Sequence, residues 1–265
     1  MKKCYAVLSI TLMLFVLSCQ EQDSLKKEIP QDVVSKLNNA GFDTSEGLSR
    51  YQNGYLVEYD IFLTDDQINN ISAAVSIGSD AEEEHYRTYN LVTGTPRTLL
   101  VYMDPGFDAY MQNSFNTALS RYNNLGLNLS FQRTTTASAA NIQILSFFEN
   151  SNTLGYSAGF PTSSGNPASP IRLNTRYYNS SSQRADAITV IAHEIGHAIG
   201  LRHTDYMARR FSCGMGGNEG SAGVGAVYIP GTPKKGERGS YMLACSDGTD
   251  RPFTAGDKTA LTTVY

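Results

Sequence analysis

Three of the chain's four histidines lie within one 11-residue window, residues 193–203. At positions i and i+4 of a helix, His193 and His197 project from the same face, so both imidazoles can reach one tetrahedral zinc ion. Gly200 can adopt a positive φ and end the helix, which would turn the chain so that His203 approaches the same metal. Three protein ligands leave a fourth position open, as catalytic zinc sites do and closed structural sites do not.

Glu194 stands directly beside the first histidine of this window. Zinc would lower the pKa of a water molecule towards about 7 and polarise a carbonyl group. The Glu194 carboxylate would then take the proton of the water and return it to a leaving amine. Together these residues predict hydrolysis of an amide bond with one zinc ion as the cofactor.

The window 193–203 resembles the extended signature H-E-x-x-H-x-x-G-x-x-H of the metzincin clan of zinc metallopeptidases, which it matches without exception. The string H-E-I-G-H at 193–197 looks more narrowly like the bacterial dual-action HEIGH metallopeptidase family. The resemblance implies a zinc endopeptidase that acts on protein or peptide substrates. It also implies that a methionine turn lies beneath the metal.

Residues 240–242, Ser-Tyr-Met, are the candidate for this methionine turn, with Met242 as its methionine. Some metzincins place a tyrosine that reaches the zinc two residues after the methionine. Ala244 stands there in this chain, so no such tyrosine is expected.

Two other functions remain open from the residues alone. A zinc amidase that acts on non-protein amides would use the same groups. A surface binding lipoprotein could keep a relic zinc site, although a merely structural zinc has no use for Glu194. The sequence therefore favours the enzyme.

The residues around the window indicate the elements that must position it. A long helix is expected from about residue 183, apolar on nearly every side and therefore buried. A strand at 98–103 precedes a helix over 111–125, which should close at Gly126. Further strands are expected at 127–131, 142–147, 154–160 and 171–173.

This order predicts an α+β fold in which helices pack on a mixed sheet. The resemblance makes it metzincin-like, with a twisted sheet, a backing helix, a central zinc-binding helix and a small C-terminal subdomain. A final helix is expected near 254–265. We place the catalytic domain at 96–265.

Residues 19–95 are interpreted as a tether followed by an N-terminal region without chemistry of its own. A strand is expected near 54–63, which is rich in aromatic and branched residues. The hypothesis is that about 29–90 form a pro-region that covers the cleft and keeps the enzyme latent. A purely structural N-terminal strand is the alternative.

The residue that could impose latency is a carboxylate, because no cysteine lies between Cys19 and Cys213. An acidic oxygen can occupy the open position of zinc and displace the water. Asp60 is the candidate, and Asp65 and Asp66 stand nearby.

Residues 155–160 are expected to form an edge strand over the cleft, where an extended substrate could bind by strand addition. This weak strand precedes Pro161, which is tolerated at an edge. A plain surface strand is the alternative.

The first 18 residues read as an export signal. Two lysines precede a 13-residue apolar run, 5–17, and the small Ser18 follows. Residues 16–19 resemble the lipobox of a bacterial lipoprotein, in which cleavage precedes Cys19 and its thiol carries the lipid. Ordinary cleavage after Ser18 is the alternative. As a lipoprotein the protein is expected at the outer membrane or cell surface, and with ordinary cleavage it is expected to be secreted.

Two cysteines remain in the rest of the chain, Cys213 and Cys245. In an oxidising compartment they could form a disulfide. Two unrelated buried thiols are the alternative.

Composition excludes several classes of protein. The hydrophobic fraction of 41% argues against disorder, and 23 glycines without a three-residue period argue against collagen. The formal net charge is −4 and the chain has no basic stripe, so nucleic acid is not expected as a partner. A membrane is expected as a partner only through the lipid anchor, and the sequence does not indicate the oligomeric state. His85, in an acidic run, is expected on the surface.

Overall fold

The structure, a computed structural model, describes most of the chain. The described residues are 29–40, 42–45, 47–71, 85–179, 182, 184–215, 225–234 and 236–265. The predictions for the export signal 1–18 and for Cys19 lie outside them.

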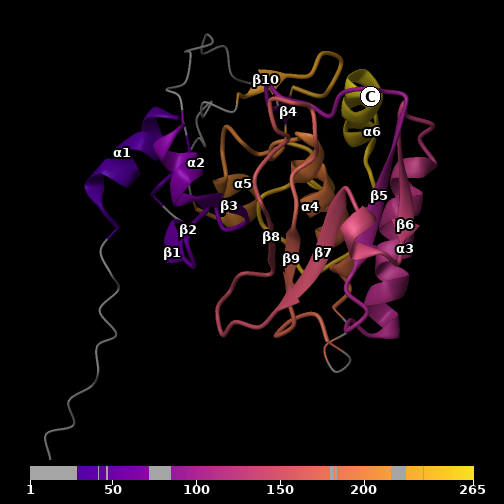
Figure 1. Ribbon diagram of the computed structural model, residues 1–265. Helices are drawn as coiled ribbons and strands as arrows, with labels where there is room; N and C mark the ends of the chain where they lie inside the picture. Colours follow the sequence, from indigo (N-terminus) through magenta and orange to yellow (C-terminus); the bar gives the residue numbers. More distant parts are fainter. Residues whose placement is uncertain are drawn as a thin grey trace, which may run out of the picture.

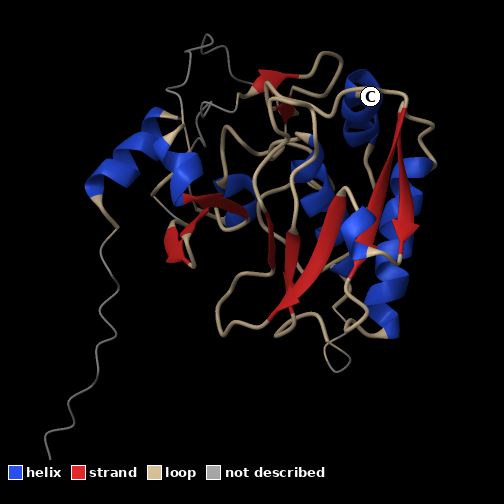
Figure 2. Cartoon of the chain, viewed as in Figure 1, coloured by secondary structure: helices blue, strands red, loops and turns tan. Residues whose placement is uncertain are grey.

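The described chain contains both helices and strands (Figures 1 and 2). The helices are α1 (Gln31–Asn39), α2 (Asp65–Asn69), α3 (Ala109–Asn123), α4 (Ala187–Ile199), α5 (Arg210–Cys213) and α6 (Ala255–Val264), with a short 3-10 helix at Ala137–Ala139. The strands are β1 (Ser49–Tyr51), β2 (Gly54–Val57), β3 (Ile61–Thr64), β4 (Tyr86–Arg87), β5 (Arg97–Met103), β6 (Leu129–Thr134), β7 (Ile142–Phe147), β8 (Gly155–Ser157), β9 (Ile171–Asn174) and β10 (Val227–Tyr228).

One eight-stranded sheet organises the molecule, in the order β1-β2-β3-β8-β9-β7-β5-β6. Strand β5 runs parallel to β6 and β7, and β7 runs parallel to β9. Strand β8 is antiparallel to β9, so the sheet is mixed. The predicted α+β fold is confirmed. Strands β4 and β10 form a separate two-stranded sheet.

Strand β5 and helix α3 show how the pattern of residues builds the core. Alternate residues of β5, namely Leu99, Val101 and Met103, are buried. Asp108 caps the start of helix α3, because its side chain accepts a hydrogen bond from the backbone N–H of Met111. Helices α3 and α4 pack against each other, α3 on β6 and α4 on β8 and β9 (Figure 1).

Helix α4 is the central helix that the apolar run predicts, although it begins at Ala187 and not near 183. Every residue of it except Ile188 is buried. The helix ends at Gly200, which has φ +109 and whose N–H donates to the carbonyls of Gly196 and His197. A residue with a Cβ would be strained there, so glycine fixes the direction in which the chain leaves the helix.

The N-terminal region has a small apolar cluster of its own, which includes Phe42, Val57 and Ile68. It lies at the side of the molecule drawn in indigo in Figure 1. Val92 instead belongs to the main core, and its N–H donates to the hydroxyl of Tyr265. The domain boundary near 95 stays a prediction.

The C-terminal helix α6 matches the final helix expected near 254–265. Thr254 and Asp257 form a capping box at its start, in which each side chain accepts from the other's backbone N–H. None of the helices in the described ranges combines the length and apolarity needed to cross a membrane.

Candidate active site

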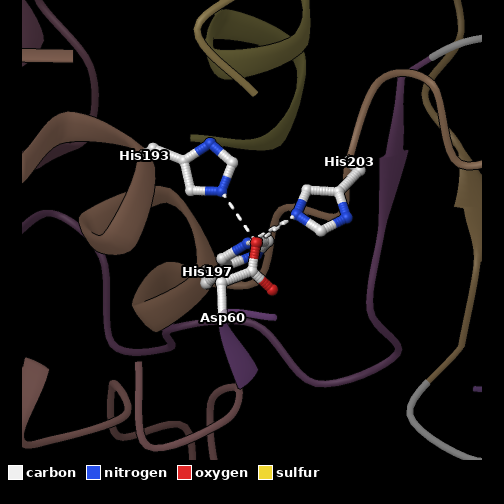
Figure 3. Close-up of side chains that lie close together, drawn as sticks. All are labelled: Asp60, His193, His197 and His203. Carbon is white, nitrogen blue, oxygen red and sulfur yellow. Dashed lines mark hydrogen bonds and ion pairs between the residues drawn. The ribbon is translucent and has the colours of Figure 1, made fainter. Parts of the chain in front are cut away.

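Helix α4 places the first two histidines as their spacing predicts (Figure 3). The rings of His193 and His197 lie on one face, 4.6 Å apart between centroids. Both are buried, since His193 is 7% exposed and His197 is fully covered. Burial lowers the pKa of His197 to about 4. The ring is therefore neutral at pH 7, which is the form that binds a metal.

The turn at Gly200 brings the third histidine to the same point. Leu201 forms a β-bridge with Arg87, and His203 follows two residues later. The Nε2 atoms of His197 and His203 are 3.1 Å apart. Two nitrogens that share a tetrahedral zinc at 2.0–2.1 Å would lie about 3.3–3.4 Å apart. The spacing of these rings therefore suits one metal ion.

Backbone carbonyls orient the two helical histidines. His193 donates from Nδ1 to the carbonyl oxygen of Tyr241, at 2.9 Å, and His197 donates from Nδ1 to that of Leu201, at 2.8 Å. A carbonyl can only accept, so each Nδ1 carries the proton and each Nε2 keeps its lone pair for a metal.

Met242 lies under helix α4, where a methionine turn is expected. It is 1% exposed, and a Cβ added at Gly196 would stand 2.5 Å from its sulfur. Its carbonyl oxygen accepts from the N–H of Thr204, which follows His203. The turn thus contacts the helix and the third histidine at once, and it explains why residue 196 is glycine.

Asp60 enters this cluster from the N-terminal region (Figure 3). Its Oδ2 lies 2.8 Å from Nε2 of His203, 3.4 Å from that of His193 and 3.8 Å from that of His197. Burial opposes ionisation, but the charge of His203 and the close contacts with the three imidazoles lower the pKa of Asp60 well below its usual range. Asp65 and Asp66 lie elsewhere, since Asp65 pairs with Arg50 and Asp66 is exposed.

Glu194 is 2% exposed and lies close to β8, since a Cβ added at Gly155 would stand 3.7 Å from its Oε1. Burial, and after it the charge of Asp60, raise the pKa of Glu194 well above its usual range. Its Oε2 is buried and has no hydrogen-bond partner among the described residues.

The donor set of this cluster fits zinc. Three imidazole nitrogens and one carboxylate oxygen, from Asp60, His193, His197 and His203, lie within 4.8 Å of one another. Nitrogen and oxygen ligands in this number are typical of zinc sites.

A family comparison agrees with this site. The model of the dual-action HEIGH metallopeptidases matches residues 55–265, which is most of the chain. The chain belongs to the dual-action HEIGH metallopeptidase family. It is therefore a metallopeptidase, and the zinc that this family implies is the cofactor predicted from the histidines.

Two solved structures of myroilysin are similar to this HEIGH metallopeptidase. One is 13% identical with a TM-score of 0.44, over 68% of this chain and 98% of that chain. The other is 14% identical with a TM-score of 0.43, over 67% of this chain and 86% of that chain. No curated protein matches the chain.

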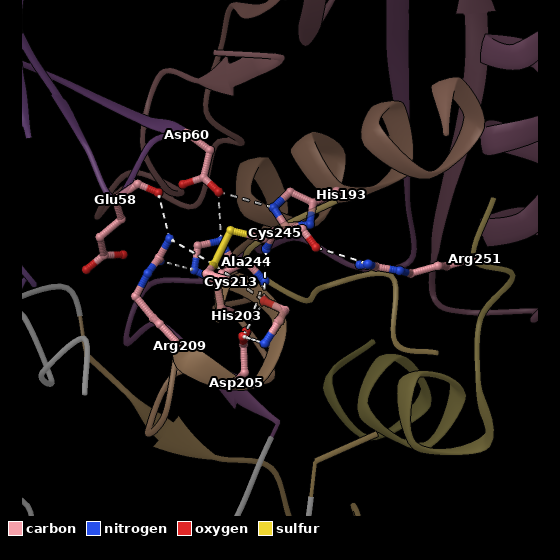
Figure 4. Close-up of a disulfide and its surroundings, with 11 residues drawn as sticks. Glu58, Asp60, His193, His203, Asp205, Arg209, Cys213, Ala244, Cys245 and Arg251 are labelled. Atoms are coloured by element: carbon pink, nitrogen blue, oxygen red, sulfur yellow. Dashed lines mark hydrogen bonds and ion pairs between the residues drawn. A yellow bond between two sulfur atoms is a disulfide. The ribbon is translucent and has the colours of Figure 1, made fainter. Parts of the chain in front are cut away.

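In this HEIGH metallopeptidase, Cys213 and Cys245 form a disulfide that staples the segment after His203 to the segment after Met242 (Figure 4). Asp205 adds to the staple, because it accepts from the N–H of Ala244 at 2.9 Å. The disulfide therefore helps to fix the loop that carries His203.

The prediction that residues 155–160 form an edge strand is wrong, because this segment lies inside the sheet. Strand β8 lies between β9 and β3. Its Ser157 pairs with Ile61, and the Ser157 N–H donates to the carbonyl oxygen of Asp60 at 2.9 Å. Strand β3 of the N-terminal region covers this edge, and local sequence patterns do not reveal which strands pair.

The surface position predicted for His85 is also wrong. The residue is 3% exposed, and its Nε2 lies 3.1 Å from Oδ1 of Asp257 in α6. Asp257 also accepts from the Ser240 hydroxyl, beside the methionine turn. The sequence around His85 suggested a surface position because an acidic run precedes it. Its buried partner, Asp257, lies far along the chain and is not apparent from local sequence.

Replacing His203 by alanine should lower zinc affinity as well as turnover, because two imidazoles then remain to hold the ion. The measurement is zinc per chain after dialysis, together with peptide hydrolysis. Asp66→Ala is the control, because Asp66 is exposed on α2 and should leave the zinc content unchanged. Unchanged zinc content in His203→Ala would remove His203 from the ligand set.

Proposed function

We propose that this metallopeptidase is an exported endopeptidase in which Glu194 is the general base and His193, His197 and His203 hold the zinc. The observation that carries the proposal is the position of Glu194. Its buried Oε2 has no hydrogen-bond partner among the described residues, and its neighbour His193 is in the cluster. A carboxylate with a free oxygen beside three convergent imidazoles is suited to take a proton from water.

Zinc held by His193, His197 and His203 would supply a Lewis acid that acidifies water and polarises the scissile carbonyl. Glu194 would take a proton from water and give it to the leaving amine. The carbonyl oxygens of Tyr241 and Leu201 keep the two helical histidines oriented throughout.

The experiment is digestion of a peptide library and of a cell-wall preparation by the zinc-loaded protein, with and without a chelator. Cleavage of internal peptide bonds that stops with the chelator and returns with zinc is the expected result. Cleavage confined to the cell-wall preparation would favour the zinc amidase. Binding to either material without any cleavage would favour the surface binding lipoprotein with a relic zinc site.

Export as a lipoprotein is supported by residues 1–18 and by Cys19 in a lipobox-like context. The disulfide between Cys213 and Cys245 suits the same compartment, since such bonds persist where the environment is oxidising. The outer membrane or cell surface is the proposed location.

The N-terminal region is proposed to keep the enzyme latent. Strand β3 covers β8 beside the cleft, and Asp60 projects its carboxylate among the three histidines. Without β1, β2 and β3, strand β8 would be the edge of the sheet and could receive an extended peptide. The region therefore stands where both the metal's open position and the substrate backbone would be.

The two residues before Asp60 support a latency role. Glu58 has φ +55 and Tyr59 has φ +72, which is the left-handed region for two consecutive residues with a Cβ. Such conformations cost of order 1–3 kcal/mol each and persist only where the surroundings impose them. The strained turn directs Asp60 into the site.

Two buried arginines from the catalytic part hold that turn. The Arg202 guanidinium lies 3.5 Å from the Glu58 carboxylate, and both side chains are fully buried. Arg209 donates from Nη2 to the carbonyl oxygen of Glu58 at 3.4 Å (Figure 4) and lies over the ring of Tyr59. These contacts join the N-terminal region to the loop that carries His203.

A further inference from the structure

A cavity of about 380 Å³ adjoins the zinc-site cluster along the face of α4 that carries His193 and Glu194. Leu154, Val190 and Leu243 give it apolar walls. Because it opens beside the proposed base, a substrate residue next to the scissile bond could place its side chain there.

Two arginines line the cavity. Apart from Asp60, Glu194 and the histidine at the zinc end, the charged side chains that line it among the described residues are Arg184 and Arg251. Both are cations. The backbone N–H of Arg251 donates to the hydroxyl of Thr189, which stands one helical turn before His193. The backbone of Arg251 therefore lies about one helical turn from His193.

Arg184 already has a full partner. Its Nε and Nη2 donate to the two oxygens of Asp186, at 3.0 and 2.6 Å, and the Asp186 side chain is fully buried. This bidentate pair neutralises the charge and uses the fork of donors.

The guanidinium of Arg251 is less completely paired than that of Arg184. Its side chain is 7% exposed, and Nη2 donates to the carbonyl oxygen of Cys245 at 3.0 Å. The same atom lies 3.2 Å from Asp247, whose side chain is 54% exposed and so shares its charge with solvent. The Nε atom is buried without a partner among the described residues. Figure 4 shows the guanidinium extending towards His193 and Cys245.

We propose that this cavity is a side-chain specificity pocket and that Arg251 selects a substrate residue ending in a carboxylate, glutamate above all. The methylene groups would lie on the apolar walls, while the carboxylate would accept hydrogen bonds from the guanidinium. Glutamine would bind more weakly, because its amide carries no charge. The proposal rests on the peptidase activity proposed above.

The test uses quenched peptides that differ only in the residue on either side of the scissile bond, which is glutamate, glutamine, leucine or lysine. The zinc-loaded chain is used in the form, full-length or processed, that cleaves the general library fastest. A charge-assisted contact predicts that kcat/KM for glutamate exceeds that for leucine by roughly 10- to 100-fold on one side of the bond.

Arg251→Met should abolish that preference, and Arg251→Lys should keep part of it. Arg133→Met is the matched control, because Arg133 lies on β6 and contacts Gln112 and Asn116 outside the cavity. Thermal unfolding shows which variants are folded. A wild-type preference for leucine, or an unchanged glutamate-to-leucine ratio in folded Arg251→Met and Arg251→Lys, would overturn the proposal.

Calorimetric binding of the same peptides to zinc-loaded Glu194→Gln separates the pocket from the chemistry. If Glu194→Gln binds the glutamate peptide best, and the double variant Glu194→Gln/Arg251→Met loses that preference, the pocket is supported. This holds even if the wild-type protein cleaves no peptide, an outcome that would overturn the proposed function alone. Cleavage and binding without any preference for glutamate would leave the proposed function standing and overturn the pocket.

Discussion

Replacing Glu194 by glutamine is expected to lower kcat by roughly 100- to 10,000-fold, the usual contribution of a general acid–base residue. The amide has nearly the shape of the carboxyl group but cannot accept the proton of the water. Zinc content should stay at the wild-type level, because Glu194 is outside the set of ligands. Steady-state hydrolysis of a quenched peptide and metal analysis of the same sample measure both quantities.

Glu149→Gln provides the matched control for this change. Glu149 is a partly buried glutamate that accepts from Ser151 in the loop after β7, and it does not line the cavity. It should keep wild-type turnover. Near wild-type kcat in Glu194→Gln with normal zinc content would show that another group is the base.

Replacing Asp60 by alanine should raise the activity of the full-length protein towards small peptides by roughly 10- to 100-fold. The Asp60 carboxylate would compete with water for the open position of the zinc. A charge-assisted contact of this kind is worth roughly 1.5–3 kcal/mol, and each 1.4 kcal/mol is a factor of ten. Activation should remain partial, because β3 still covers β8 and Arg202 still pairs with Glu58. The measurement is kcat/KM of full-length wild type and variant before any processing.

Asp66→Ala is the control within the same region, since Asp66 is exposed on α2 and should have no effect. The reference for full activity is a version that begins just before His85. A start near 95 would remove the contacts of His85 with Asp257 and of Val92 with Tyr265. Full-length wild type that already equals this reference would contradict latency.

The zinc-site helix could be predicted because its geometry is local. His193 and His197 share a face through the 3.6-residue period of the helix, and Gly200 can take the left-handed conformation that ends it. The same reasoning gave the buried central helix, β5 and α3. Helix α4 begins about four residues after the predicted position, because the apolar pattern does not mark where a helix begins.

The position of Asp60 could be suspected from the sequence but not distinguished from that of Asp65 or Asp66. All three are acids within seven positions. What separates them is the strained turn at Glu58 and Tyr59, which depends on contacts with arginines far along the chain.

The sequence by itself determined the chemistry, namely two imidazoles and a carboxylate at fixed helical spacing and a third imidazole just beyond the glycine that ends the helix. The tertiary structure alone decided what surrounds that chemistry. Long-range packing placed β3 against β8, buried His85 and brought Arg251 to the cavity beside His193. The physical reason is that helix geometry follows from neighbouring residues, whereas strand pairing and buried charge partners follow from the energy of distant segments packing together.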